Sequence, residues 1–308
     1  MAKCGLIGNP ISHSKSPALF AAAYGTGKHS YSLIEAPTCK EAMKRFADEG
    51  FTGTNVTSPF KDEVMEHVSI PDSITSLLGS ANTIISSNGK LCSYNTDYYG
   101  VKITLQAFLQ ATGNTGASLC ATTDIHPQLR NTEASLCATT DIHPQLRNTK
   151  DPLCASAGTR LQSGNPLEHP KQLTALVVGA GGAGKAAALA VKDMGMEVYF
   201  ANRSSHAAKP FAEKIGAEYI PLDSIPLLLP KTDIIVYNLS MEIDPLKDIS
   251  LEGKIVFEAN YAHPNLNNKG AHTYIDGRYW LYNQAIPAFK LFTGEEPCTT
   301  AMARVMGL

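Results

Sequence analysis

The chain places a lysine and an aspartate where two predicted strands end. A polar-edged strand over residues 54–57 runs into Ser58-Pro59, and Lys61 follows at once. Asp97 comes directly after another predicted strand and opens a helix. Open α/β sheets place their sites at such strand ends, which favours a functional role for both charges. The structural alternative is a solvated Lys61 and a first-turn acid that complements the helix dipole.

Ser14 and Ser16 stand immediately before a second predicted helix. Ser16 followed by Pro17 suits an N-cap with proline at the first helical position, which is the structural explanation. The same geometry has a functional interpretation, because hydroxyls at a helix N-terminus can hold a carboxylate.

A glycine turn at residues 179–184 reads GAGGAG and satisfies the pattern G-x-G-x-x-G. It follows an apolar strand and opens an alanine-rich helix, which is the context that a dinucleotide-binding turn requires. Gly179 and Gly181 allow a tight turn and a close approach to a pyrophosphate, whose charge the helix N-terminus favours. A glycine-rich turn between packed elements is the alternative.

Asn202-Arg203-Ser204 ends the next predicted strand. NAD-binding domains often carry an acid there, about twenty residues after the glycine turn. An arginine suits a 2′-phosphate instead, so the sequence favours NADP(H) over NAD. Arg203 as a solvated strand-end residue is the alternative.

Strand and helix patterns alternate in both halves of the chain, which predicts the α/β class with mostly parallel sheets. Asn88-Gly89 between apolar runs predicts a hairpin, and Pro287 should kink or interrupt the helix in which it lies. We expect two domains around a cleft: an N-terminal α/β substrate domain at 1–112 plus 283–308, and a Rossmann-like dinucleotide-binding domain at 171–282.

The composition changes at 113–170, where ASLCATTDIHPQLRNT occurs twice, at 117–132 and 134–149. The repeat lacks the apolar periodicity of solenoid units, and its polar character predicts a mobile surface loop. Each copy pairs a cysteine with a histidine at one spacing, but without a C-x-x-C pair we predict no metal site.

The bulk composition is that of an ordinary globular protein. Of 308 residues, 44% are hydrophobic and 18% are charged, and the formal net charge is −2. Such a balance predicts no nucleic-acid partner, and no apolar run is long enough for a membrane span. The odd number of cysteines, seven, favours reduced thiols and a cytoplasmic location, and the short N-terminal apolar run predicts no secretory signal. We expect a monomer or homodimer.

Seven segments of the chain together resemble the shikimate dehydrogenase family. They occur in the family's order over nearly the whole chain outside 113–170, and the combination of S-x-S, N-V-T-x-P-F-K and N-T-D is specific. The resemblance implies an oxidoreductase that reversibly reduces 3-dehydroshikimate to shikimate with NADPH, in aromatic amino acid biosynthesis. The segments are GNPISHSKSP, NVTSPFK, GSANTI, YNTDYYG, GAGGAGKA, NRS and NQAIPAFKLFTG.

The resemblance also implies a role for each candidate residue. Lys61 would be the proton-transfer residue, and Asp97 would hold it in place and bind a ring hydroxyl. The small-molecule substrate would be bound by Ser14, Ser16, Thr57, Asn82, Tyr261 and Gln284. The cofactor would be bound by Gly179, Ala180, Gly181, Gly182, Ala183, Asn202, Arg203, Ser204 and Gly277.

Two segments depart from the family pattern. Trp280 stands where the usual G-x-G-M-L-V-x-Q has a smaller, flexible residue near the nicotinamide, and Asn238-Leu239-Ser240 replaces a stretch similar to N-A-T-S. Two other functions stay open: a quinate or quinate/shikimate dehydrogenase of broader specificity, and a catalytically weak ligand-binding sensor on the same fold.

Overall fold

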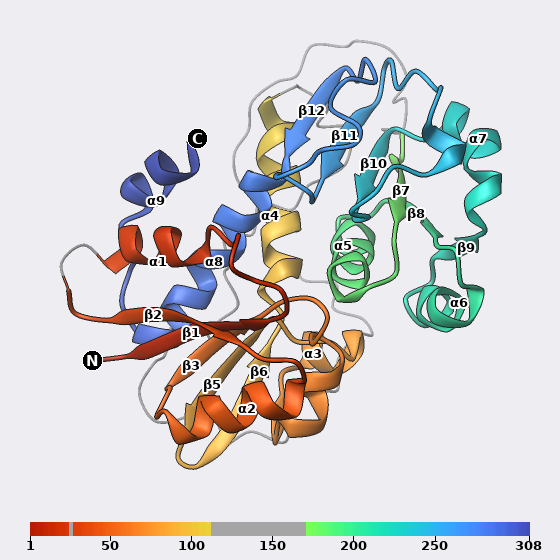
Figure 1. The fold of residues 1–308 in the computed structure, drawn as a ribbon. Coiled ribbons are helices and arrows are strands. Elements are labelled where there is room, and N and C mark those ends of the chain that lie inside the picture. Colours follow the sequence, from red (N-terminus) through yellow and green to blue (C-terminus); the bar gives the residue numbers. More distant parts are fainter. Residues whose placement is uncertain (25–26, 112–170) are drawn as a thin grey trace, which may run out of the picture.

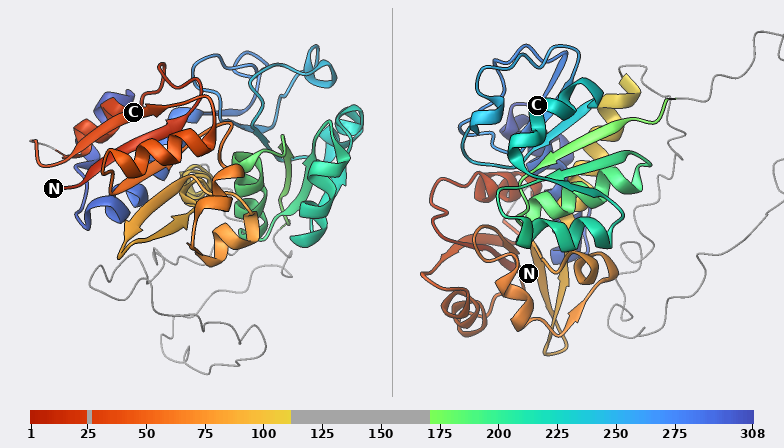
Figure 2. Two further views of the ribbon diagram at one scale, coloured as in Figure 1. Left: turned by 60° about the horizontal axis from the view of Figure 1, so that its bottom comes forward. Right: turned by 90° about the vertical axis from the view of Figure 1, so that its right-hand side faces the viewer.

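The computed structural model describes residues 1–24, 27–111 and 171–308, so the predictions for 113–170 lie outside the described residues. The described chain forms two sheets of six strands each, in separate lobes (Figure 1). The two lobes can also be told apart in both views of Figure 2. The predicted α/β class with two sheets is confirmed.

The N-terminal sheet is mixed, with the strand order β2-β1-β3-β5-β6-β4. Its first three strands are parallel, whereas β5 is antiparallel to β3 and β6. Asn88 and Gly89, with φ of 50° and 73°, form the tight turn between β5 and β6, so the hairpin prediction is confirmed. The strands are β1 (Lys3–Gly8), β2 (Ser30–Glu35), β3 (Gly53–Val56), β4 (Ile70–Pro71), β5 (Thr83–Ser87) and β6 (Lys90–Tyr94).

Helices cover both faces of this sheet. Phe46 of α2 packs with Ile7 and Ile34 on one face, and Phe20 of α1 packs with Phe289 and residues of α9 on the other. The helices of this half are α1 (Ser16–Tyr24), α2 (Cys39–Asp48), α3 (Ser73–Leu78), α4 (Thr96–Ala111) and α9 (Thr299–Met306), with a 3₁₀ turn at Glu63–His67.

The C-terminal sheet is parallel throughout, with the order β12-β11-β10-β7-β8-β9. Its central strands are buried on both faces, as parallel sheets require. The elements are β7 (Thr174–Val178), α5 (Gly182–Asp193), β8 (Glu197–Ala201), α6 (Ser205–Lys214), β9 (Glu218–Ile220), α7 (Ile225–Leu228), β10 (Ile234–Tyr237), β11 (Ile255–Glu258) and β12 (Thr273–Asp276), with 3₁₀ turns at Leu222–Ser224, Leu229–Lys231 and Asp244–Leu246.

Two helices join the sheets. The helix α4 leaves the N-terminal sheet, but its buried side packs against α5 in the core of the C-terminal half. The helix α8 (Gly277–Thr293) begins directly after β12 and ends among the helices of the N-terminal half (Figure 1). It continues through Pro287, so the helix is not interrupted there, and a kink at Pro287 stays a prediction. The predicted domain boundary at 282–283 falls inside this helix and stays a prediction.

Candidate active site

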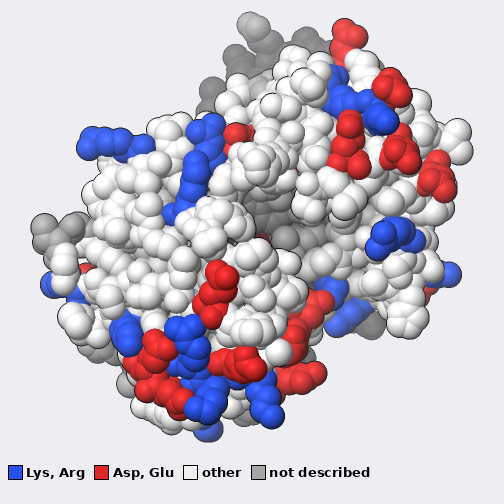
Figure 3. Space-filling view, viewed as in Figure 1, with Lys and Arg blue, Asp and Glu red and all other residues white. Residues whose placement is uncertain are grey.

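A cleft of about 450 Å³ lies between the two halves and is lined by residues of both. Figure 3 shows the hollow near the middle of one face of the molecule. The cleft lies where the first strands of the N-terminal sheet end and where α8 begins. The lining includes all eight residues predicted to be catalytic or substrate-binding: Ser14, Ser16, Thr57, Lys61, Asn82, Asp97, Tyr261 and Gln284.

Lys61 and Asp97 form an ion pair in this cleft. The Lys61 Nζ lies 2.5 Å from the Asp97 Oδ2, and the two side chains are only 17% and 8% exposed. The backbone of Lys61 is fixed because its carbonyl oxygen accepts from the Ala81 N–H at 2.9 Å. Asp97 lies in the first turn of α4, where the helix dipole favours a carboxylate. Because both side chains are largely buried and both backbones are fixed, the ion pair has a defined position in the cleft.

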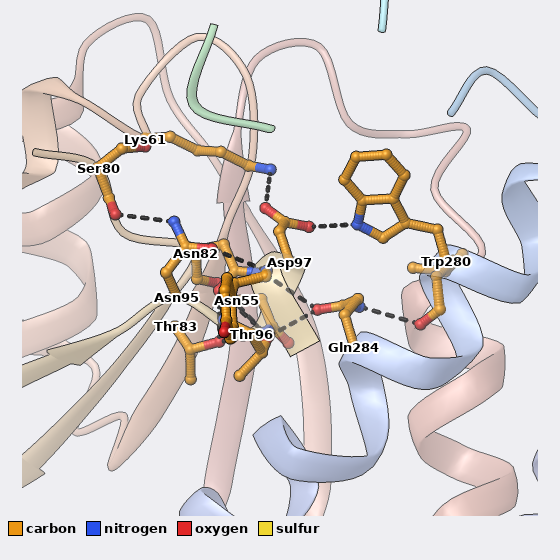
Figure 4. A network of polar contacts seen from close by, with 12 residues as sticks. Asn55, Lys61, Ser80, Asn82, Thr83, Asn95, Thr96, Asp97, Trp280 and Gln284 are labelled. Carbon is orange, nitrogen blue, oxygen red and sulfur yellow. Dashed lines mark hydrogen bonds and ion pairs between the residues drawn. The ribbon is translucent and has the colours of Figure 1, made fainter. Parts of the chain in front are cut away.

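Trp280 is a third member of this group. Its indole Nε1 donates to the Asp97 Oδ1 at 3.0 Å, so each carboxylate oxygen of Asp97 has a separate donor. Figure 4 shows Lys61 and Trp280 reaching Asp97 from opposite sides. The sequence shows Trp280 as a departure from the family pattern. The sequence does not predict its hydrogen bond with Asp97, because the two residues are 183 positions apart.

An amide and hydroxyl network holds Gln284 beside the ion pair. The Gln284 Oε1 accepts from the Asn82 Nδ2 at 3.3 Å and from the Thr96 Oγ1 at 3.0 Å. The Asn82 Oδ1 accepts from the Thr96 backbone N–H at 2.7 Å, which fixes the orientation of the Asn82 amide. Asn82 and Gln284 are buried, so the network presents preformed polar groups to the cleft (Figure 4).

Ser14 and Ser16 also line the cleft, just before and at the start of α1. The Ser14 Oγ accepts from the Ser16 backbone N–H and donates to the Ser16 Oγ, each at 3.2 Å. The helix α1 begins at Ser16 itself, so Ser16 is its first helical residue and the N-cap prediction is wrong, whereas the functional interpretation stays a prediction. His13, which the sequence analysis did not single out, lines the cleft beside them.

Tyr261 reaches the cleft from the loop after β11. The Lys15 ammonium lies 5.5 Å from the centre of its ring, so the contact joins the two halves. Burial raises the pKa of the Tyr261 hydroxyl above its ordinary value, and a hydrogen bond with the Lys15 backbone opposes this effect. The hydroxyl is therefore neutral near pH 7 and can donate or accept a hydrogen bond.

The glycine turn follows β7 and has a different constraint at each glycine. Gly179 has a φ of +102°, which a side chain rarely adopts. A Cβ on Gly184 would collide with the Gly179 carbonyl, so this glycine permits close packing of α5 on the turn. A Cβ on Gly181 would have no neighbour within 4 Å. Gly181 therefore faces open space at the N-terminus of α5, where an anion could approach.

Gly182 lies against the N-terminal half. A Cβ there would overlap the Ser80 Oγ and would lie 3.1 Å from the Lys61 Cβ and 3.2 Å from its Cδ. The glycine turn and the stem of Lys61 are therefore in direct contact. The Ser80 Oγ is buried and has no hydrogen-bond partner among the described residues.

The remaining residues predicted to bind a cofactor lie around this turn. Ala183 and Gly277 line the cleft itself. The Asn202 Oδ1 accepts from the Ala180 N–H at 3.3 Å, and Arg203 and Ser204 are exposed at the end of β8. Asn238, at the end of β10, donates to the Val178 carbonyl at 3.3 Å, and its own Oδ1 is buried without a partner in the described chain.

The described residues show neither a candidate metal site nor a helix that could cross a membrane. They contain no group of three or more His, Cys, Asp or Glu side chains placed to hold a metal ion. Among the same residues, no helix is both long and apolar enough to cross a membrane. Among the described cysteines, Cys4, Cys39 and Cys298 are free thiols.

Comparison with protein families finds two matches. A model described as the shikimate dehydrogenase substrate binding domain matches residues 6–84, and a model described as shikimate / quinate 5-dehydrogenase matches residues 164–249. The shikimate dehydrogenase (NADP(+)) of Natronomonas pharaonis is 31% identical over 97% of this chain and 97% of its own length.

Solved structures of similar fold cover nearly all of this chain. The shikimate dehydrogenase of Aquifex aeolicus has a TM-score of 0.69 at 25% identity and covers 99% of this chain and 97% of its own. A quinate dehydrogenase of Corynebacterium glutamicum, in complex with NAD, has a TM-score of 0.67 at 20% identity and covers 100% and 99%. At that lower identity the likeness establishes the fold alone.

Proposed function

Because the chain belongs to the shikimate dehydrogenase family, we propose that it reversibly reduces 3-dehydroshikimate to shikimate with NADPH and that Lys61 transfers the proton. The pair of Lys61 and Asp97 carries this proposal. It is an ion pair of 2.5 Å with little exposure, in a cleft lined by both halves. The glycine turn contacts the stem of the same lysine. The proposed proton-transfer residue therefore lies next to the proposed dinucleotide site.

Lys61 carries the proton in the proposed reaction. Reduction adds a hydride to the carbonyl carbon and a proton to the carbonyl oxygen, and bound NADPH supplies the hydride. The Lys61 ammonium donates the proton to the oxygen as negative charge develops on it, and in the reverse direction the neutral amine accepts it. Asp97 keeps the ammonium in the cleft through its Oδ2, so Lys61 does not have to be reoriented before each turnover.

The polar groups of the cleft suit a small hydroxylated carboxylate. Ser14 and Ser16 offer hydroxyls at the start of α1, which fit a carboxylate. Asn82, Gln284 and Thr57 line the same cleft and can hold ring hydroxyls. In the proposed complex the two groups together fix the substrate, with its carbonyl toward Lys61.

The glycine turn and its surroundings fit a phosphorylated dinucleotide. Gly181 leaves open space at the first turn of α5, which suits a pyrophosphate. The buried Oδ1 of Asn238 has no partner in the described chain, so it can accept a hydrogen bond from a bound group. Arg203 is exposed after β8 and suits a 2′-phosphate, which favours NADP(H).

The test is a turnover assay that follows reduced cofactor by absorbance. The unaltered protein is given shikimate or quinate, each with NADP⁺ or NAD⁺, and we expect the highest kcat/KM with shikimate and NADP⁺. Preference for quinate would assign the broader alternative instead. Absence of turnover with every pair, together with measurable shikimate binding, would favour the ligand-binding sensor.

The role of Lys61 is tested with Lys61→Ala. We expect kcat to fall about a hundredfold or more while the KM for shikimate changes much less. Lys290→Ala is the matched control, because Lys290 is similarly buried, at 16% exposure, and pairs with Glu296 at 2.8 Å outside the cleft. A near-normal kcat with a raised KM in Lys61→Ala would make Lys61 a binding residue, and the proposed mechanism would be wrong.

A further inference from the structure

We propose that Trp280 is a positioning residue, whose indole N–H holds the Asp97 carboxylate in the orientation that presents its other oxygen to Lys61. The inference rests on the proposed function, because it assigns the orientation of Asp97 a part in the same reaction. The Trp280 Nε1 lies 3.0 Å from the Asp97 Oδ1, and the Lys61 Nζ lies 2.5 Å from the Oδ2.

Asp97 needs this second donor because its carboxylate is nearly buried, at 8% side-chain exposure. The terminal torsion of aspartate is broad, so a single contact at one oxygen leaves the carboxylate free to rotate. Donors at both oxygens remove that freedom. A buried charge also requires compensation at each polar atom, and water has little access here.

Trp280 is itself held rigidly, so its N–H has a fixed direction. The residue is 4% exposed. Its ring packs against Phe257 of the C-terminal sheet, with 5.4 Å between the ring centres. On the other side, Gly100 of α4 lets the two helices approach, since a Cβ there would lie 3.1 Å from the Trp280 Cδ1 and 3.0 Å from the Trp280 carbonyl oxygen.

The position of Trp280 joins the ion pair to both halves of the molecule. Phe257 belongs to β11, Asp97 belongs to α4, and Trp280 lines the cleft between Gly277 and Gln284. An indole N–H donates and cannot accept, so it suits the acceptor oxygen that Asp97 presents to it. A more flexible, apolar side chain at this position would leave the Oδ1 without this donor.

Trp280→Phe tests the inference because it keeps an aromatic ring for Phe257 and removes the N–H donor, together with part of the ring volume. We expect kcat to fall about tenfold, with the KM for shikimate within about twofold of the unaltered protein. In an Asp97→Asn background the same change should cost no further kcat, because the donor acts through the carboxylate. An unchanged kcat, or an equal loss in both backgrounds, would overturn the inference.

A second measurement does not depend on turnover or on the folding of Trp280→Phe. Trp280 is the single tryptophan of the chain, so indole emission reports this site alone. Excitation moves electron density away from the pyrrole ring, so a carboxylate at the N–H stabilises the excited state. Asp97→Asn should therefore shift the emission to shorter wavelength.

Asp193→Asn is the matched control for the emission, because Asp193 accepts at 2.8 Å from the Tyr98 hydroxyl of α4, and the indole N–H of Trp280 donates to Asp97 instead. It should leave the emission unchanged. If Asp97→Asn also leaves it unchanged, Trp280 does not hold Asp97. Lack of turnover by the unaltered protein would contradict the proposed function, while the emission would still decide the contact.

Discussion

Replacement of Gly182 by alanine tests whether the glycine turn and Lys61 touch in the working enzyme. A methyl group at this position would overlap the Ser80 Oγ and would lie 3.1 Å from the Lys61 Cβ and 3.2 Å from the Lys61 Cδ. The backbone itself accepts alanine, because Gly182 is the first residue of α5. The strain therefore falls on the contact between the two halves.

Two opposing effects set the change in stability. Overpacking costs about 1–3 kcal/mol, and alanine is favoured over glycine in a helix by up to about 1 kcal/mol. The free energy of unfolding should therefore fall by roughly 0–3 kcal/mol, which lowers Tm by no more than about 12 °C for a chain of this size. The effect on catalysis is larger. A displacement of about 1 Å can cost about a hundredfold in rate, so a shift of Lys61 by a few tenths of an ångström should lower kcat about tenfold.

The measurement compares Gly182→Ala with Gly181→Ala at saturating shikimate and NADP⁺. Gly181 has φ of −71° and ψ of 177°, which alanine adopts without strain. Its Cβ would meet nothing within 4 Å. Gly181→Ala should keep its Tm and raise the KM for NADP⁺, because only a bound cofactor would meet the methyl group. A Gly182→Ala enzyme with the kcat of the unaltered protein would refute the contact as a determinant of Lys61 geometry.

Three further predictions concern single side chains. Arg203→Ala should raise the KM for NADPH about tenfold or more and leave the KM for NADH unchanged, because the charge of Arg203 suits the 2′-phosphate. Equal use of both cofactors by the unaltered protein would contradict this prediction. The control is Arg304→Ala, since Arg304 is also exposed. Gly100→Ala should lower the free energy of unfolding by about 1–3 kcal/mol, since its Cβ would lie 2.9 Å from the Gln284 Cβ; a Tm at or above that of the unaltered protein in thermal denaturation would disprove it. Tyr261→Phe should raise the KM for shikimate and leave the pH dependence of kcat unchanged below about pH 10, because burial raises the pKa of Tyr261 and keeps its hydroxyl protonated. Loss of an alkaline limb of the pH profile in the variant would show that the hydroxyl ionises in this range.

The sequence was sufficient for the fold class and for the elements that carry the site. The Asn88-Gly89 turn specifies its hairpin locally, since both residues adopt positive φ. Lys61 and Asp97 were identified because each follows a strand, and strand ends converge at one edge of a sheet. Their separation is 36 positions, and the structure brings them within 2.5 Å. Their roles stay proposals.

Contacts between helices of different halves could not be predicted. The hydrogen bond from Trp280 to Asp97 depends on how α8 packs on α4, and Gly100 decides that spacing. The contact of Gly182 with Ser80 depends on how closely the two sheets approach. Local sequence propensity predicts neither the packing of α8 on α4 nor the approach of the two sheets. Pro287 is the converse case, because its local signal for an interruption is overridden within α8.

The helix α8 also acts as a spacer of fixed length across the cleft. Gly277 and Gln284, which we propose to face the cofactor and the substrate, are seven residues apart on one continuous helix, which corresponds to about 10 Å along the axis. Substitutions along this stretch can alter which groups face the cleft. One inserted residue, however, would turn Gln284 by about 100° around the axis and move it about 1.5 Å further. Residue types along this stretch can therefore vary. The number of residues between Gly277 and Gln284 is constrained by the distance between the proposed cofactor and substrate sites.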